Sequence, residues 1–135
     1  PKIYFRDGGW LHTLLNLPTR DDVLGHPVAG GSWEGFVIEQ ILNAVSPLCT
    51  AGYYRTSGGA EADLIVEWPG GERWVMEIKR SPAATPQRGF YEVRKDVNPD
   101  KSFLVHSGTD RFPLQHGVES IGLRDMCNLA QERAL

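Results

Sequence analysis

The sequence predicts an α/β domain built on one central, mixed sheet of four to five strands that is flanked by helices. Two observations lead to this prediction. Segments with the apolar period of a helix alternate along the chain with segments that alternate residue by residue as strands do, and two strand-like segments are joined by a short turn. At 135 residues the chain has the length of one domain, so we expect residues 1–135 to fold as a single unit.

Local patterns define the elements. Pro18 ends a short amphipathic segment, Ser32 is a good N-cap for the next apolar-periodic segment, and Pro86 takes the first helical position, which proline favours. The predicted elements, in chain order, are a strand at 2–5, helices at 10–17 and 33–45, a hairpin of strands at 53–68 and 72–81, a helix at 85–97, strands at 101–108 and 117–123, and a helix at 124–135.

Composition excludes several classes of function. The chain is 41% apolar, and it has no run of about 18 apolar residues that would cross a bilayer, so we expect a cytoplasmic protein with no membrane partner. A net charge of −3 disfavours non-specific binding of nucleic acid over the whole surface, although it is compatible with a local basic groove. The sequence contains no GxxxxGK[ST] loop, which excludes ATP binding by that route in this chain.

The most informative segment is DLIVEWPGGERWVMEIK, residues 63–79. If residues 69–71 form a three-residue loop, Asp63 stands directly across from Glu77 on the neighbouring strand. Because side chains alternate between the faces of a sheet, this register separates the hairpin into two sets. One face carries Asp63, Ile65, Val75, Glu77 and Lys79, and the other, which we expect to form the main core, carries Leu64, Val66, Trp68, Trp74, Met76 and Ile78.

The opposed acids have two interpretations. Like charges directly across a sheet are destabilising, by about 3 kcal/mol at roughly 5 Å and an effective dielectric constant near 20, and by much less in water. On a solvated face, the favourable pairs Glu67–Arg73 and Glu61–Lys79 would make one repulsive pair tolerable. On a covered face, the acids would need a ligand that offsets their repulsion, so the pattern alone leaves both interpretations open.

The helix after Ser32 is the expected cover for Ile65 and Val75 on that face. Glu34 lies in its first turn and shares a stripe with apolar residues at positions +4, +7 and +11, so we expect its carboxylate to point at the hairpin acids. The alternative is that Glu34 only complements the positive end of the helix dipole.

A helix glutamate, a strand aspartate and a Glu-x-Lys on the partner strand occur here in the order that resembles the PD-(D/E)xK nucleases of the restriction-endonuclease-like fold. Nearly all of the chain, through KIYFRDGGWLH, HPVAGGSWEGFVIEQIL, YYRTSGGAEADLIVEW and RWVMEIKRS, resembles a C-terminal domain of unknown function (DUF4143 type) behind the ATPase module of prokaryotic AAA-type ATP-binding proteins. Since the chain opens on Pro1, we expect it to be the C-terminal fragment of such an ATPase, with ATP bound only by an upstream domain absent from this chain.

The resemblance implies a metal-dependent nuclease that hydrolyses DNA phosphodiester bonds, with Mg²⁺ or Mn²⁺ as its cofactor and with DNA and the upstream ATPase domain as partners. Asp63 and Glu77 then ligate the metal, Glu34 assists as an auxiliary ligand, and Lys79 positions the attacking water. Whether the domain is an active enzyme stays open. The alternatives are an inactive nuclease-like module that binds nucleic acid or protein and regulates the ATPase, and a purely structural domain; a homo-oligomer is compatible with each.

The segment QRGFY resembles a motif that follows the lysine in some exonucleases related to the RecB nuclease domain. Gln87 of this segment, together with Arg80 and Arg88, is therefore expected to contact nucleic acid. The competing interpretation is a solvated helix surface, and we favour it for Arg94 and Lys95.

Overall fold

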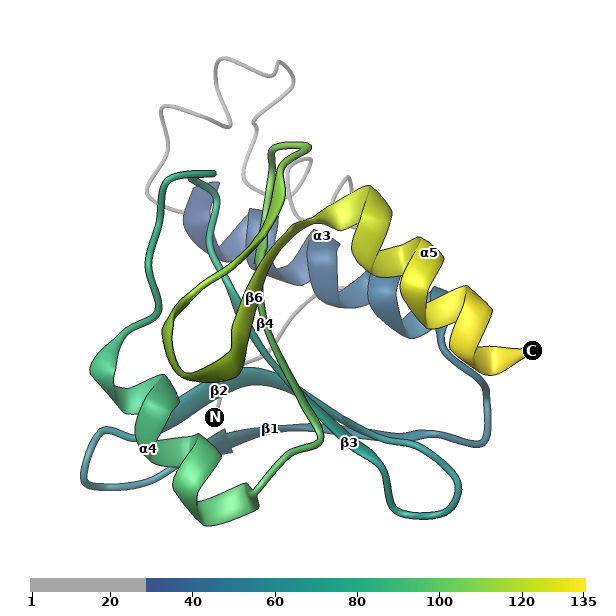
Figure 1. Cartoon of the computed structure of the whole chain (residues 1–135), viewed down its shortest axis with the longest axis horizontal. Coiled ribbons are helices and arrows are strands. Elements are labelled where there is room, and N and C mark those ends of the chain that lie inside the picture. Colours follow the sequence, from purple (N-terminus) through teal and green to yellow (C-terminus); the bar gives the residue numbers. More distant parts are fainter. Residues whose placement is uncertain (1–28) are drawn as a thin grey trace, which may run out of the picture.

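The computed structural model describes residues 29–135, so the strand expected at 2–5 and the helix expected at 10–17 lie outside the described residues. The described part of the chain folds into three α-helices, one short 3₁₀ helix and six strands (Figure 1). Their bounds are α3 Ala29–Ala44, β1 Thr50–Arg55, β2 Glu61–Glu67, β3 Arg73–Ile78, α4 Arg88–Val97, β4 Lys101–His106, β5 Arg111–Pro113, η1 Gln115–Gly117, β6 Val118–Gly122 and α5 Leu123–Ala134.

All six strands form one mixed sheet in the order β1-β2-β3-β4-β6-β5. The pairs β1–β2, β2–β3 and β5–β6 are antiparallel, whereas the pairs β3–β4 and β4–β6 are parallel. Helices α3 and α5 pack together over one face, and α4, which connects the parallel strands β3 and β4, covers the other (Figure 1). The result is a helix–sheet–helix sandwich with the sheet in the middle.

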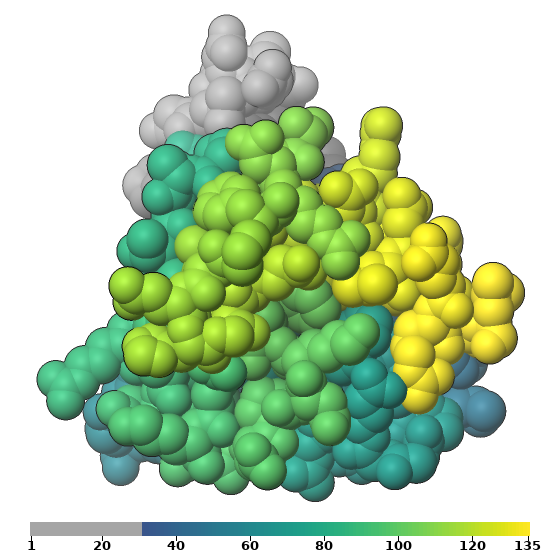
Figure 2. All heavy atoms as spheres, in the orientation of Figure 1, coloured from purple at the N-terminus to yellow at the C-terminus, as the bar shows by residue number. Residues whose placement is uncertain are grey.

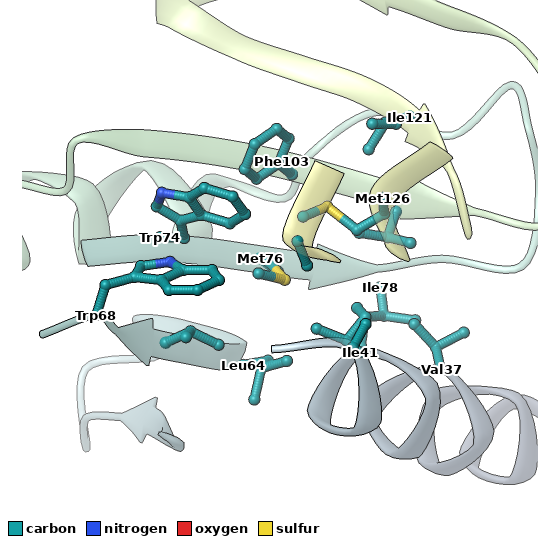
Figure 3. Close-up of a cluster of buried hydrophobic side chains, with 14 residues drawn as sticks. Val37, Ile41, Leu64, Trp68, Trp74, Met76, Ile78, Phe103, Ile121 and Met126 are labelled. Carbon is teal, nitrogen blue, oxygen red and sulfur yellow. The ribbon is translucent and has the colours of Figure 1, made fainter. Parts of the chain in front are cut away.

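The main core lies between the sheet and the α3–α5 pair, where Figure 3 shows its side chains converging. Its hairpin members are the six residues that the predicted register assigned to this face: Leu64, Val66, Trp68, Trp74, Met76 and Ile78. The ring centroids of Trp68 and Trp74 lie 4.9 Å apart, and those of Trp74 and Phe103 lie 5.5 Å apart. Each fully buried side chain of this size contributes about 1.5–3 kcal/mol, so this cluster anchors the hairpin.

The hairpin has the predicted register. Ile65 pairs with Val75, and the backbone N–H of Trp68 donates to the carbonyl oxygen of Glu72 at 2.8 Å across a three-residue loop. Gly70 and Gly71 have φ angles of +96° and +95°, a region of backbone space that only glycine enters freely. The odd loop length therefore fixes which side chains of the two strands share a face.

Two strands were not predicted, and the prediction of four to five strands is wrong. The segment 53–68, expected as one strand, is broken by a turn, with β1 ending at Arg55 and β2 beginning at Glu61. The N–H of Thr56 closes this turn on the carbonyl of Ala60 at 2.9 Å. β1 and the three-residue β5 are almost entirely exposed edge strands, so their sequences lack the alternation that marks a half-buried strand.

The helices also correct three expectations. Ser32 lies inside α3 and is buried, so it is not the N-cap, and α4 begins at Arg88 rather than at 85–86. The cover over Ile65 and Val75 is α4 and not the helix after Ser32, because the apolar stripe of α3 packs on the opposite, core-facing side of the hairpin. Within the described residues, no helix combines the length and apolar content needed to cross a lipid bilayer.

The first turn of α4 lies very close to the β1–β2 turn. A Cβ atom added at Gly89 would stand 2.3 Å from the carbonyl oxygen of Gly59 and 3.4 Å from the Cα atom of Ala60. Such a separation is far below van der Waals contact, so only glycine lets the helix approach the turn this closely. This contact sets the position of α4 on its face of the sheet.

Candidate functional site

A pocket of about 180 Å³ lies where α3, β2, the end of β3 and the start of α4 meet. It is lined by Glu34, Glu61, Asp63, Glu77, Ile78, Lys79 and Gln87, and we call it the acidic pocket. All four side chains predicted as catalytic, those of Glu34, Asp63, Glu77 and Lys79, are thus brought to one place from three separate elements.

Asp63 binds across the hairpin to the partner strand. Its Oδ2 atom accepts a hydrogen bond of 2.8 Å from the backbone N–H of Ile78. The backbone ladder between β2 and β3 extends only to the pair Leu64–Met76, one position short of Asp63. A side-chain carboxylate thus continues the pairing beyond the ladder, which holds Asp63 close to Glu77.

Glu77 is buried, with 5% of its surface exposed. Its Oε2 atom accepts a hydrogen bond of 3.1 Å from the backbone N–H of Gln87, and its Oε1 atom lies 3.5 Å from Nζ of Lys79. Gln87 is the N-cap residue of α4, and its own side chain makes no capping bond. The carboxylate of Glu77 therefore meets the positive end of the α4 dipole and satisfies one of the donors that a helix leaves unpaired there.

Burial raises the pKa of Glu77 above its ordinary value. The N–H of Gln87 and the ammonium of Lys79 act in the opposite direction, and the nearby carboxylate of Asp63 adds to the increase. Desolvation prevails over these two favourable partners. A cation bound beside Glu77 would favour its ionised form, so this carboxylate is placed in a setting where positive charge is stabilising.

Backbone contacts of Lys79 bring α3 to the pocket. The N–H of Lys79 donates to the carbonyl of Val105 at 2.9 Å, which ties the end of β3 to β4. The carbonyl of Lys79 accepts a hydrogen bond of 3.2 Å from the indole Nε1 of Trp33, the residue before Glu34. Since this bond joins the first half of α3 to the end of β3, it explains how Glu34 comes to line the pocket although α3 packs on the core side.

The three residues predicted to contact nucleic acid are placed differently from one another. Gln87 lines the acidic pocket. Arg80 is exposed, and its carbonyl accepts a hydrogen bond from the hydroxyl of Ser107. Arg88 lines a separate pocket of about 630 Å³ beside the β1–β2 turn. The structure therefore brings only Gln87 together with the predicted catalytic residues.

Glu61 is a member of the pocket that the sequence interpretation missed as a site residue. It lies two positions before Asp63 on β2, so strand alternation places both on the same face. The same register that joined Asp63 to Glu77 would have identified it. It was interpreted instead only as the cross-strand partner of Lys79.

The donor set of the acidic pocket fits a hydrated, hard cation. Across residues 29–135, no group of three or more His, Cys, Asp or Glu side chains is placed so that it could hold a metal ion. Mg²⁺ does not need three protein ligands, because it is commonly held by one or two carboxylates together with waters and substrate phosphates. Asp63 and Glu77 supply two carboxylates, and about 180 Å³ has room for several waters at roughly 30 Å³ each.

Comparison with known sequences identifies relatives over most of the chain. The family model described as "Domain of unknown function (DUF4143)" matches residues 29–126. The "Uncharacterized protein Rv2008c" of Mycobacterium tuberculosis and the "Uncharacterized protein Mb2031c" of Mycobacterium bovis are each 40% identical over 123 residues, which is 90% of this chain and 27% of the relative. The chain thus spans about a quarter of the length of these relatives.

One solved structure resembles the fold. It is described as the "refined half-complex from tetradecameric assembly of Thermococcus gammatolerans McrB AAA+ hexamers with bound McrC". The match has a TM-score of 0.54 and 11% sequence identity, and it covers 78% of this chain and 33% of the matched chain. At this identity the likeness concerns the fold alone.

Proposed function

This chain belongs to the DUF4143 family, and we propose that its domain is a metal-dependent nuclease that hydrolyses DNA phosphodiester bonds in the acidic pocket. One observation supports the proposal above all others. Glu34, Asp63, Glu77 and Lys79, identified from their order along the sequence, line a single small pocket although they come from α3, β2 and the end of β3.

In this proposal Asp63 and Glu77 hold the metal, with Glu34 as an auxiliary ligand. Mg²⁺ or Mn²⁺, when bound, polarises the phosphodiester and lowers the pKa of its bound water. Lys79 keeps its ammonium group 3.5 Å from Glu77, where it orients the water that attacks the phosphorus. The hydrogen bonds from Ile78 to Asp63 and from Gln87 to Glu77 hold the two carboxylates in place before substrate arrives.

The experiment is DNA cleavage by the purified chain with MgCl₂ or MnCl₂, on supercoiled plasmid and on a short single strand. Asp63→Asn, Glu77→Gln and Lys79→Ala should each lower the rate by about 10³-fold or more, because each removes a group that acts on the reacting atoms. EDTA should abolish cleavage by the parent.

A matched control is Glu67→Gln, which removes a carboxylate from the same strand as Asp63 at the end far from the acidic pocket. This variant should cut as the parent does. Cleavage that survives Lys79→Ala and Asp63→Asn unchanged would show that another site or a contaminant is responsible, and the nuclease proposal would then be abandoned.

The restriction-endonuclease-like fold and the ATPase context belong to the same proposal. Support for the fold comes from the mixed sheet and from the placement of a helix glutamate, a strand aspartate and a Glu-x-Lys strand end around one pocket. Support for an AAA-type ATPase partner and for oligomers comes from the resembling structure, which is described as containing AAA+ hexamers. Mass measurement of the full-length relative with and without ATP tests the proposed ATPase context, and an unchanged monomer that binds no ATP would contradict it.

A second candidate function has its own supporting observation. Both carboxylate oxygens of Glu77 already have partners within the chain, in the N–H of Gln87 and the ammonium of Lys79. Such a satisfied network also fits an inactive nuclease-like module that binds nucleic acid or protein and regulates the ATPase. Calorimetric titration with Mg²⁺ and Mn²⁺ separates the two candidates. The nuclease should give a heat of metal binding that Glu77→Gln abolishes, whereas the inactive module should give no such heat.

A further inference from the structure

A third pocket, of about 480 Å³, lies between α4 and the turn that precedes β6. It is lined by Tyr91, Arg94, Lys95, Gln115 and His116, and we call it the basic pocket. Figure 2 shows the yellow-green surface of the β5–β6 segment lying against the green surface of α4 on the face in view. The volume falls in the range of small-molecule sites, about 300–1,000 Å³, and so suits a nucleotide better than an isolated phosphate.

Arg94 is held in position at this pocket. Its Nε atom donates a hydrogen bond of 2.8 Å to the hydroxyl of Ser102, a residue of β4 that is 4% exposed. The two terminal nitrogens of the guanidinium take no part in that bond. A guanidinium fixed through Nε presents its remaining donors as a planar fork, which suits phosphate oxygens.

His116 adopts an unusual backbone conformation beside Tyr91. Its φ and ψ angles are 59° and 30°, a left-handed conformation that a residue other than glycine adopts at a cost. The imidazole and the Tyr91 ring meet edge to face, with centroids 5.5 Å apart. Two aromatic rings therefore stand in the wall of a pocket that also carries Arg94 and Lys95.

The last-turn cations of α4 line the basic pocket. Arg94 and Lys95 face it, and Nζ of Lys95 also lies 4.0 Å from Oε1 of Glu92, an exposed pair that a phosphate can replace. Cations in the last turn also complement the helix dipole. That role accounts neither for the bond from Arg94 to a buried hydroxyl nor for the left-handed backbone at His116.

We propose that the basic pocket binds one nucleotide of a single strand of DNA, whose neighbouring segment enters the acidic pocket. Arg94 and Lys95 contact the phosphates, and the base stacks on Tyr91 and His116. The inference rests on the proposed nuclease function and adds to it a substrate class, since a base enters such a pocket only when it is unpaired.

The position of α4 gives the spacing between the two sites. Gln87 lines the acidic pocket, whereas Tyr91 and Lys95 line the basic pocket. At a rise of 1.5 Å per helical residue, these two lie about 6 and 12 Å from Gln87 along the helix axis. The bound nucleotide is therefore only a few positions from the phosphodiester that is cut.

Binding is measured by fluorescence anisotropy with a labelled single strand in EDTA, over a series of KCl concentrations. Lys95→Ala should weaken binding about threefold and lower the salt slope by about 0.7, the contribution of one phosphate contact on a single strand. Tyr91→Leu should weaken binding about tenfold at an unchanged salt slope, because stacking is lost while the charges remain.

His116→Gly tests the pocket with a substitution that the backbone at this position favours. Glycine relieves the left-handed backbone, so this variant should melt no lower than the parent and still lose affinity about threefold. Arg124→Ala, at an exposed position of α5, is the charge-matched control and should bind as the parent does. A competing duplex of the same sequence should displace the labelled strand less effectively than an unlabelled single strand.

Each outcome separates this inference from the nuclease proposal. Binding that depends on Lys95, Tyr91 and His116, without metal-dependent cleavage, supports the basic pocket and rejects the nuclease. Cleavage that requires Lys79 while these three variants bind as the parent does rejects the basic pocket and leaves the nuclease. A parent that binds no single strand in EDTA, or that prefers the duplex, also overturns the inference.

Discussion

The two ends of the β2–β3 hairpin differ in which charged side chains they bring together. At the turn end, Glu67 and Arg73 are directly opposed and their side chains meet at 2.8 Å. At the other end, Asp63 and Glu77 come together with further carboxylates in the acidic pocket. The same two strands obey the same alternation throughout. Ordinary cross-strand pairing therefore explains the charges at the turn end. At the opposite end like charges lie together, and sheet pairing alone does not account for their placement.

The pKa values of two glutamates on this hairpin express the difference. The pKa of Glu72, at the turn end, is lowered by hydrogen bonds from the indole of Trp74 at 2.8 Å and from Arg133, also at 2.8 Å. The pKa of Glu77, at the pocket end, is raised by burial. The folded chain thus favours the charged form of one glutamate and opposes the charged form of the other.

The largest effect is expected at the turn end, from removing its core side chain. Trp74→Ala should lower the free energy of unfolding by about 3–5 kcal/mol, because it opens a cavity beside Trp68 and Phe103. Urea denaturation followed by circular dichroism measures it. Tyr53→Ala, at an exposed position on β1, should cost less than about 1 kcal/mol. A cost below about 1.5 kcal/mol for Trp74→Ala would show that the turn end does not anchor the hairpin.

Metal binding should act at the pocket end alone. A ligand at about 100 times its Kd stabilises the state that binds it by about 2.7 kcal/mol, so saturating Mg²⁺ should raise the melting temperature of the parent by several degrees. Glu77→Gln and Asp63→Asn should remove this increase, and Glu72→Gln should retain it. Equal stabilisation of all four proteins would place the metal elsewhere.

Acid should affect the two ends in opposite directions. The raised pKa of Glu77 means that the native state binds a proton more tightly than the unfolded state does, so stability from this group grows as pH falls from 7 toward its unfolded value near 4.5. Without metal, Glu77→Gln should therefore be more stable than the parent at pH 7, by on the order of 1 kcal/mol, and this advantage should disappear near pH 4.5.

At Glu72 the expected dependence of stability on pH has the opposite sign. Its lowered pKa gives stability that is present above the unfolded value near 4.5 and is lost as pH falls through the lower folded value. Glu72→Gln should be less stable than the parent at pH 7, and the deficit should shrink in acid. Thermal melts of both variants and the parent between pH 7 and pH 3 measure the two differences. Parallel pH profiles would remove the contrast between the ends.

The smallest effect belongs to the exposed pair at the turn. Glu67 and Arg73 are each nearly half exposed, so their interaction should contribute only about 0.2–1 kcal/mol and should weaken in high salt. A double-mutant cycle with Glu67→Gln and Arg73→Gln measures the coupling. A coupling above about 2 kcal/mol would mean that the pair is more than ordinary cross-strand pairing.

The pairing of Asp63 with Glu77 could be predicted because it depends only on the number of residues in the loop. An odd loop and strict alternation place Asp63 and Glu77 on one face. Glu34 was expected there because its helix was expected to cover that face, but α3 packs on the other side and Glu34 reaches the pocket beside the bond from Trp33 to Lys79. What sequence could not supply was contact through backbone atoms. The N–H of Gln87 that binds Glu77, and the carbonyl of Lys79 that receives the Trp33 indole, carry no side-chain signal.

Elements of the fold escaped prediction for a related reason. β1 and β5 are exposed edge strands without an alternating pattern, so nothing in their composition separates them from loop. The covering role of α4 was assigned to α3 because both helices have an apolar stripe, and a stripe does not say which face of a sheet it will meet.

The close approach of Gly89 to the carbonyl of Gly59 means that the β1–β2 turn limits how near α4 can lie to the sheet. Gln87 lies two residues before Gly89, Glu61 lies two residues after Gly59, and both line the acidic pocket. A side chain at position 89 would push α4 away from the turn and so change the separation of these two lining residues. Replacing Gly89 should therefore loosen the acidic pocket without changing any of its carboxylates.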